Sequence, residues 1–181
     1  MDSAFEYQLE VLKVELDYTN SAIRQMDEMM KSTKNWAIAT WTAGLGIVIV
    51  AESLKPFIGL TVIIPILFWI VDANYRRLQN KFIFRNYQIS DFLNDERFKQ
   101  SFAEQQLINF TILDPKSKGS LRDPSYKKDY EKKVNIFNVL RYTSVCFLYI
   151  GLIIISILVH LIFNIFIAHS GDNATFINLN L

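Results

Sequence analysis

Residues 35–71 read NWAIATWTAGLGIVIVAESLKPFIGLTVIIPILFWIV, two apolar runs separated by a short polar joint. The first run, residues 35–51, has 17 residues without a charged side chain, and the second covers residues 56–71. A helix that spans a bilayer needs about 17–25 residues, so each run lies near the lower limit. The joint suits a tight reversal, because Pro56 fits the first turn of a following helix. This stretch predicts a transmembrane helical hairpin, and a pair of buried core helices in a soluble protein is the alternative.

A third apolar run favours the membrane. Residues 142–168 contain no Lys, Arg, Asp or Glu, and as a helix they would be about 40 Å long at 1.5 Å per residue. The hydrocarbon core of a bilayer is only about 30 Å thick. The sequence therefore predicts an all-α integral membrane protein with three transmembrane helices, a hairpin plus a long C-terminal helix, extended into a cytoplasmic helical bundle.

Charged residues are kept apart from the three apolar runs. Residues 1–34 carry four basic and seven acidic side chains, and residues 72–141 carry fourteen basic and nine acidic ones. The polar tail, residues 169–181, has no Lys or Arg. Because basic loops of membrane proteins stay in the cytoplasm, we expect residues 1–34 and 72–141 to be cytoplasmic and the tail to lie outside.

The first cytoplasmic segment, residues 1–34, has the periodicity of a helix that continues unbroken into the first apolar run. Apolar side chains recur at alternating steps of four and three residues, a spacing typical of a coiled-coil-like seam. The seam residues are Leu9, Leu12, Leu16, Ile23, Met26 and Met30. They predict either self-association into a homo-oligomer or packing against another helix of the same chain.

A charged pair marks the expected inner edge of the membrane. Asp72 and Arg76 are four residues apart and would share one face of a helix. A carboxylate at that depth needs a partner, so we expect an ion pair here in preference to a proton relay.

The remainder of the segment 72–141 contains further helices and a basic loop at residues 114–123. Ser101 and Glu104 have capping-box spacing and indicate a short helix. Asp123 and Pro124 form a helix start, from which one helix should run without a break into the third span.

Two features of the apolar runs concern packing. Small residues recur four apart in the first run, as in Thr40 and Gly44, and let helices approach closely. Pro65 interrupts the second run and predicts a kink.

Three polar side chains, Ser156, His160 and Asn164, lie at steps of four in the third run. Polar groups in hydrocarbon turn toward other helices or toward water. This face predicts either interhelical hydrogen bonds or, in an oligomer, the lining of a pore.

The sequence contains no recognisable catalytic, cofactor-binding or metal-binding pattern. Cys146 is the only cysteine, which excludes a disulfide within the chain and a cysteine-based metal site. No phosphate-binding glycine loop or nucleophile elbow is present. We therefore expect a protein that is not an enzyme and uses no cofactor, whose basic residues contact membrane lipid headgroups in preference to nucleic acid.

Residues 34–41 (KNWAIATW), residues 68–79 (FWIVDANYRRLQ) and the helical insert before the last span carry a resemblance of architecture across most of the chain. The chain resembles the small, helical, few-span membrane effectors and accessory proteins of bacterial anti-phage defence systems, including those beside RNA-guided nucleases and cyclic-nucleotide signalling enzymes. The resemblance implies a place in the bacterial inner membrane, a cytosolic protein partner that acts as the trigger, and depolarisation or growth arrest as the result.

Three functions are compatible with this pattern. An effector that permeabilises the membrane would have to be oligomeric, because three spans in one small subunit do not easily enclose a water path. A membrane-tethered adaptor would use its spans only as an anchor and would recruit or regulate a cytosolic partner. A small transporter subunit is the third alternative.

Overall fold

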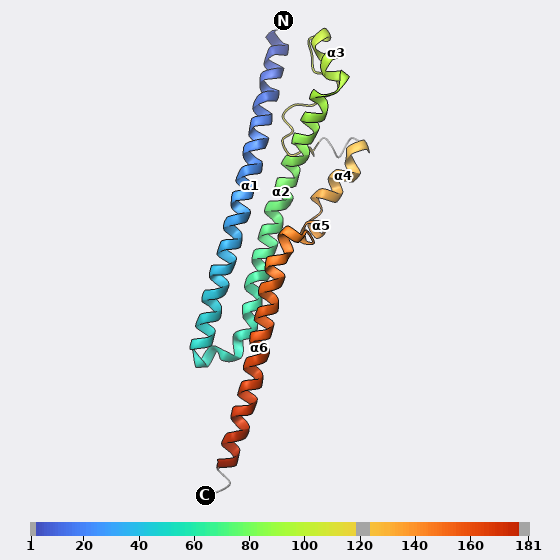
Figure 1. Cartoon of the computed structure of the whole chain (residues 1–181). Helices are drawn as coiled ribbons and strands as arrows, with labels where there is room; N and C mark the ends of the chain where they lie inside the picture. Colours follow the sequence, from blue (N-terminus) through green and yellow to red (C-terminus); the bar gives the residue numbers. More distant parts are fainter. Residues whose placement is uncertain (1–2, 119–123, 178–181) are drawn as a thin grey trace. The chain divides into compact units, whose positions relative to one another are not determined.

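The computed structural model describes residues 3–118 and 124–177, with side chains for residues 3–118 and 126–165. Over this range the chain is all-α, as predicted, with six α-helices and one 3-10 helix (Figure 1). The chain divides into unit 1, which comprises Met1–Ser32 and Asp72–Tyr142, and unit 2, which comprises Thr33–Val71 and Thr143–Leu181. These boundaries lie within two residues of the expected ends of the apolar runs.

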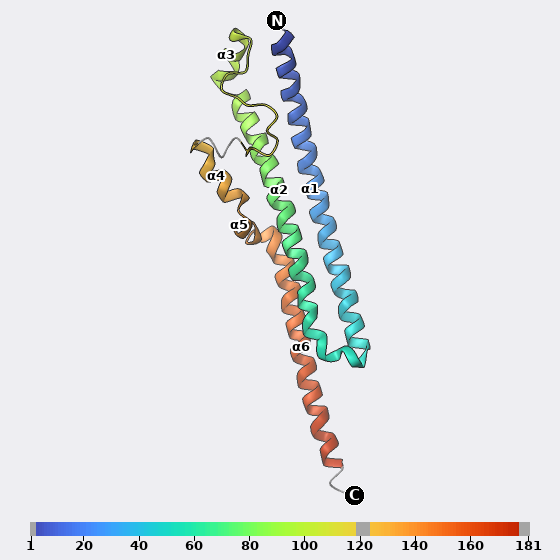
Figure 2. The same cartoon turned by 180° about the vertical axis from the view of Figure 1, so that it is seen from behind.

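Helix α1 (Ser3–Val50) is a single helix that contributes residues to both units, so the predicted continuity from the N-terminal segment into the first apolar run is confirmed. In unit 1 its buried apolar side chains include Phe5, Leu12 and Met26, spaced by seven and fourteen residues along one face. In this unit α1 lies alongside α2 and runs antiparallel to it, as Figures 1 and 2 both show.

The reversal after α1 is a 3-10 helix, η1 (Glu52–Val62), followed by α2 (Ile63–Leu93). The predicted kink at Pro65 is wrong, because α2 begins only two residues before it. Pro65 therefore lies in the first turn, where its missing N–H costs no hydrogen bond. The two arms of the hairpin pack closely at Gly44, where an added Cβ would lie 3.0 Å from Ile64 Cδ1.

Helix α3 (Glu96–Glu104) is capped by Asp95, whose side chain accepts a hydrogen bond from the Arg97 backbone N–H at 2.8 Å. The predicted capping box at Ser101 is wrong, because Ser101 lies inside α3. Its hydroxyl donates to the Arg97 carbonyl and accepts from the Ile108 N–H, which ties the segment after α3 back onto the helix.

The cap at Asp95 gives α3 a predictable dependence on pH. Hydrogen bonds from Arg97, first from its side chain and then from its backbone N–H, hold the pKa of Asp95 below its ordinary value. A lowered folded-state pKa stabilises the fold above the unfolded-state pKa of about 3.9, and this contribution disappears as the pH falls through the folded-state value. We expect acidification to increase pepsin cleavage in α3 more in the wild type than in Asp95→Asn, which keeps a capping oxygen without the charge. An equal increase in both proteins would contradict this expectation.

The predicted unbroken helix from Pro124 into the third span is wrong. Three helices occupy this stretch: α4 (Pro124–Val134), α5 (Ile136–Leu140) and α6 (Thr143–Ile177). The Asn135 side chain caps α5 by accepting from the Phe137 N–H at 2.9 Å, and this competition with the backbone ends α4. The expected cap Asp123, like residues 119–122 of the basic loop, lies outside the described residues.

Two of the described helical segments, Glu52–Leu93 and Thr143–Ile165, are long and apolar enough to cross a membrane by length and composition. Core helices of soluble proteins also pass this test. The apolar end of α1 is not among the two.

Candidate functional site

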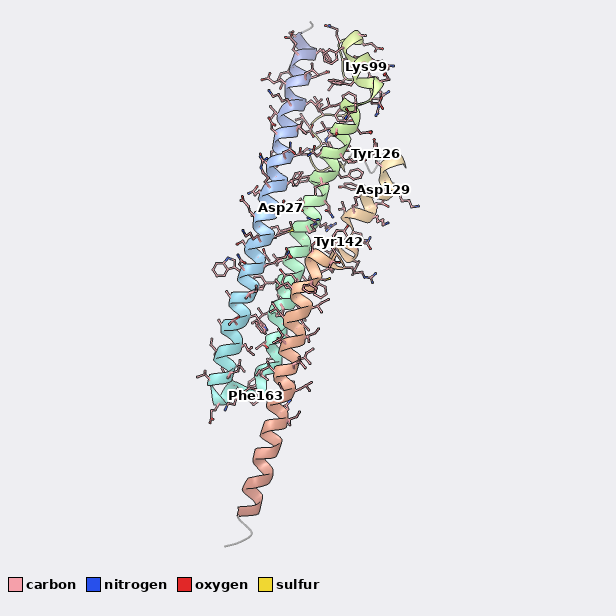
Figure 3. All side chains as sticks on the ribbon, viewed as in Figure 1. Asp27, Lys99, Tyr126, Asp129, Tyr142 and Phe163 are labelled. Carbon is pink, nitrogen blue, oxygen red and sulfur yellow. The ribbon has the colours of Figure 1, made fainter. Side chains whose placement is uncertain are left out.

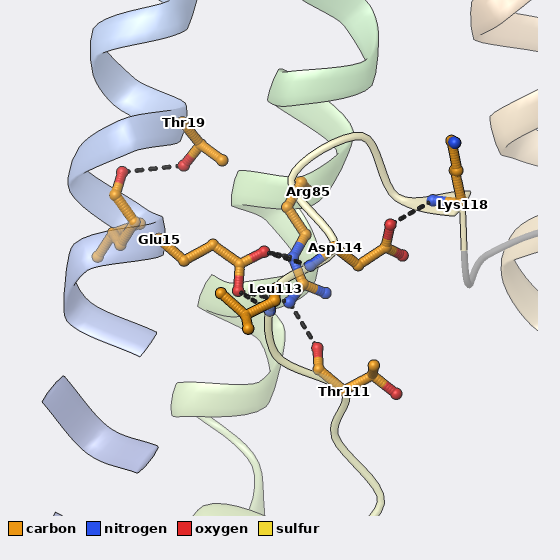
Figure 4. A network of polar contacts seen from close by, with 8 residues as sticks. Glu15, Thr19, Arg85, Thr111, Leu113, Asp114 and Lys118 are labelled. Atoms are coloured by element: carbon orange, nitrogen blue, oxygen red, sulfur yellow. Dashed lines mark hydrogen bonds and ion pairs between the residues drawn. The ribbon is translucent and has the colours of Figure 1, made fainter. Parts of the chain in front are cut away.

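A buried polar cluster of unit 1 joins α1, α2 and the segment after α3 (Figure 4). The Arg85 guanidinium donates two hydrogen bonds to the Glu15 carboxylate, from Nε at 2.9 Å and from Nη2 at 3.1 Å. The side chains of Arg85 and Glu15 are only 4% and 2% exposed. Such a bidentate pair fixes both position and angle, so it holds α1 and α2 in one register.

The same carboxylate also holds the segment that follows α3. The backbone N–H groups of Leu113 and Asp114 donate to the two Glu15 oxygens at 2.8 and 2.9 Å. Arg85 Nη2 donates to the Thr111 carbonyl at 2.6 Å, and the guanidinium lies 4.8 Å from the centre of the Phe110 ring. Leu113 adopts a φ of 62° here, a conformation that is unfavourable for leucine and that these bonds stabilise.

An aromatic cluster lies on the other side of this segment. Phe92, at the end of α2, stacks on Phe110 with a ring-centre distance of 4.2 Å and meets Phe98 edge-on at 5.6 Å. Leu12 of α1 and Ile89 complete the buried group. The cluster and the Glu15–Arg85 pair together form one part of the core of unit 1.

An open apolar groove of about 640 Å³ runs along α1 beside Glu15. We call it the α1 groove. Its walls include Tyr7, Val14 and Leu113, which are 67%, 61% and 73% exposed. Exposed apolar side chains gathered around a groove are a common feature of surfaces that bind other proteins.

A second pocket, of about 560 Å³, has a different character. We call it the basic pocket, and its lining includes Arg77 and Lys81 of α2, Lys118, and Tyr130 and Glu131 of α4. Burial lowers the pKa of Lys81, and repulsion from Arg77, Lys116 and Lys118 lowers it further. Burial, followed by the charge of Asp114, raises the pKa of Tyr130, so its phenol stays neutral.

Helix α4, which supplies Tyr130 and Glu131 to the basic pocket, is held against α2 by polar and aromatic contacts. Tyr126, labelled in Figure 3, donates from its hydroxyl to Asp91 at 2.7 Å. Phe84 meets the rings of Tyr126 and Tyr130 edge-on. Asn80 donates to the Lys133 carbonyl at 2.7 Å.

The predicted seam of α1 packs inside the chain. Leu12 and Leu16 belong to the aromatic cluster, and Met26 and Met30 are buried. Leu9 and Ile23 are half-buried. This is the packing predicted as the alternative to self-association, and self-association stays a prediction.

Arg76, one of the two residues expected at the membrane edge, is linked to α1 through Gln79. Arg76 Nη1 donates to the Gln79 side chain at 2.6 Å, and Gln79 donates in turn to Asp27 of α1 at 2.6 Å. Asp72 is fully buried. The expected Asp72–Arg76 ion pair stays a prediction.

In unit 2 the polar face of α6 divides into an inner and an outer part. Ser156 is buried, accepts a hydrogen bond from Trp41 Nε1 of α1 at 2.7 Å and donates to the Leu152 carbonyl. The His160 ring lies against Gly59 of η1, where an added Cβ would be 3.5 Å away. Asn164 is exposed, and its amide lies 3.1 Å from His160 Nε2.

Chemistry-bearing groups are sparse in the described part of the chain. It holds no group of three or more His, Cys, Asp or Glu residues placed to bind a metal ion. No protein-family model matches the chain, and no curated protein and no solved structure is significantly similar to it. The α1 groove and the basic pocket are therefore the candidate sites, and the periodicity of the sequence pointed to neither. The basic bias of residues 72–141 was the only signal for the pocket, because its cations come from α2 and from a segment about 40 residues later.

Proposed function

We propose that this chain is an integral protein of the bacterial inner membrane that crosses the bilayer three times and presents unit 1 to the cytosol as a recognition module. The supporting observation is the contrast between the two units. Large exposed apolar side chains are dense on unit 2, for example Ile47, Phe57 and Leu158, whereas unit 1 carries both candidate sites. A surface of the first kind suits lipid, and a surface of the second kind suits ligands in water.

In this proposal the spans are an anchor and unit 1 recruits or regulates a cytosolic protein. Buried pairs such as Trp41–Ser156 satisfy polar side chains of unit 2 within the chain, which favours packing over a water path. The α1 groove is the surface that we assign to the partner, because its walls carry the exposed apolar side chains of Tyr7, Val14 and Leu113.

An oligomeric effector that permeabilises the membrane is the second candidate, and one observation favours it. Asn164 is exposed on α6 between the exposed side chains of Leu161 and Ile165. An amide that faces hydrocarbon is unfavourable, and the side chains of further copies would cover it. A homo-oligomer assembled through this face would place Asn164 and His160 at the contact.

The two candidates predict opposite results in expressing cells. A tether should leave the membrane potential unchanged, measured with a potential-sensitive dye, and a cytosol-only reporter fused after Leu181 should be silent. An effector should depolarise the cells, and the double change His160→Leu with Asn164→Leu should abolish this effect. The corresponding substitution that tests the tether is Val14→Asp, which adds a charge at an exposed site in the α1 groove. An active reporter at the C-terminus would contradict both candidates, because it would exclude three crossings that start from a cytosolic N-terminus.

A further inference from the structure

We infer that the basic pocket of unit 1 binds a phosphate group through the side chains of Arg77, Lys81 and Lys118. The inference goes beyond the recognition of a cytosolic protein, since it assigns a second ligand to unit 1. It depends only on contacts within unit 1, and therefore stands independently of the number of spans.

Helix α2 supplies two cations in a fixed arrangement. Arg77 and Lys81 are four residues apart and share one face of the helix. Arg77 Nε donates to the Val134 carbonyl at 2.8 Å, which fixes the plane of the guanidinium. Its two terminal nitrogens have no hydrogen-bond partner among the described residues, so they are available as a fork that suits two phosphate oxygens.

The segment before the undescribed residues supplies the opposite wall. The Lys118 N–H donates to the Asp114 carboxylate at 2.8 Å, and the Tyr130 hydroxyl donates to the Lys116 carbonyl at 2.8 Å. These bonds hold the backbone at Lys116 and Lys118 and leave both ammonium groups without an ion-pair partner among the described residues. The Ser117 hydroxyl between them is buried and likewise has no partner in the described part of the chain.

The charges in and around the pocket do not cancel. Four cations, Arg77, Lys81, Lys116 and Lys118, face two carboxylates, those of Glu131 and Asp114, which leaves a net charge of about +2 when all are ionised. Burial is the first cause of the lowered pKa of Lys81, and repulsion from Arg77, Lys116 and Lys118 adds to it. A dianionic phosphate would balance this charge, and a monoanionic phosphate would offset half of it.

The ligand has two possible sources, an anionic lipid headgroup or a soluble phosphate compound. A pocket of about 560 Å³ is large enough for a phosphate with an organic substituent. Arg77 follows Val71 by six residues of the same helix, about 9 Å at 1.5 Å per residue. If the second apolar run is embedded, Arg77 would lie at the depth of the headgroups, where basic residues bind anionic lipids.

Binding to the purified full chain in a maltoside detergent tests the inference and separates the two sources. One arm titrates inorganic phosphate and ATP, and the other titrates short-chain phosphatidylglycerol against phosphatidylcholine. We expect Lys81→Gln to weaken binding at least about tenfold in whichever arm shows it, as expected for the loss of a charge-assisted hydrogen bond. Lys81→Arg should retain binding.

Lys99→Gln on α3 is the matched control, because it removes the same charge at an exposed site outside the pocket. It should change affinity less than about twofold. Without ligand, Lys81→Gln should be at least as heat-stable as the wild type, since it relieves repulsion. Added ligand should stabilise the wild type and leave this variant unchanged. If Lys81 had only a structural role, Lys81→Gln would be less heat-stable than the wild type without ligand, and added ligand would still stabilise the variant.

Binding in the lipid arm alone identifies a headgroup site, and binding of the soluble anions identifies a soluble ligand. No binding in either arm, or equal loss in Lys81→Gln and Lys99→Gln, overturns the inference. Neither result depends on the reporter fused after Leu181, so failure of the membrane topology and failure of the phosphate site are separate outcomes.

Discussion

Glu15→Ala is expected to destabilise unit 1 by about 3–5 kcal/mol, because it leaves the buried Arg85 guanidinium without its counter-charge. This destabilisation includes the cost of leaving the N–H groups of Leu113 and Asp114 without an acceptor in the core. We expect the segment after α3 to detach from α1 in this variant. Hydrogen exchange of residues 105–118, followed by mass spectrometry, should then increase strongly.

Glu10→Ala is the control, since Glu10 lies on the same helix and is exposed. It should change stability by no more than about 0.5 kcal/mol. The three tryptophans all belong to unit 2, so their fluorescence reports on that unit separately. Unaltered exchange in residues 105–118 of Glu15→Ala would show that the pair does not hold this segment. The double change Glu15→Met with Arg85→Met should recover much of the loss, because it removes both buried charges.

Phe92→Ala is expected to destabilise unit 1 by about 3–5 kcal/mol, the usual cost of truncating a buried aromatic side chain. Phe92 is 1% exposed and contacts the rings of Phe98 and Phe110, so its removal leaves a cavity between α2 and the segment after α3. The free energy of unfolding, measured with urea and far-ultraviolet circular dichroism in detergent, checks the size of the effect.

Tyr87→Ala on the same helix is the matched control, because Tyr87 is an aromatic residue that is 69% exposed. Its effect should be within about 0.5 kcal/mol. If both substitutions had the same effect, the aromatic cluster would not be the core of unit 1. A double change with Phe110→Ala should be less than additive, since the two rings stack on each other.

The packed seam changes how the function has to be tested. Substituting Leu12 or Leu16 by polar residues would unfold unit 1, because both belong to its core. Loss of function in such variants would therefore not distinguish a tether from an effector. Substitutions in the α1 groove, such as Val14→Asp, and on the exposed part of α6, such as Asn164→Leu, alter surfaces while they preserve the core.

The sequence alone determined the helical class and the unbroken α1. These features depend on local periodicity and on the absence of helix breakers. Both can be read from residues that are close together in the sequence. It failed at Ser101, Pro65 and Asn135, where one residue has several permitted roles. Whether Asn135 caps a new helix or lies inside a longer one depends on competition between its side chain and the backbone.

Only the tertiary structure decided the partners of the polar residues. Glu15 and Arg85 are 70 residues apart, and Trp41 and Ser156 are 115 apart, so no spacing rule connects them. The basic pocket arises in the same way, from α2, α4 and the segment before the undescribed residues. Helical periodicity shows which face of a helix is buried, but only the packing of one helix on another determines which residue it meets.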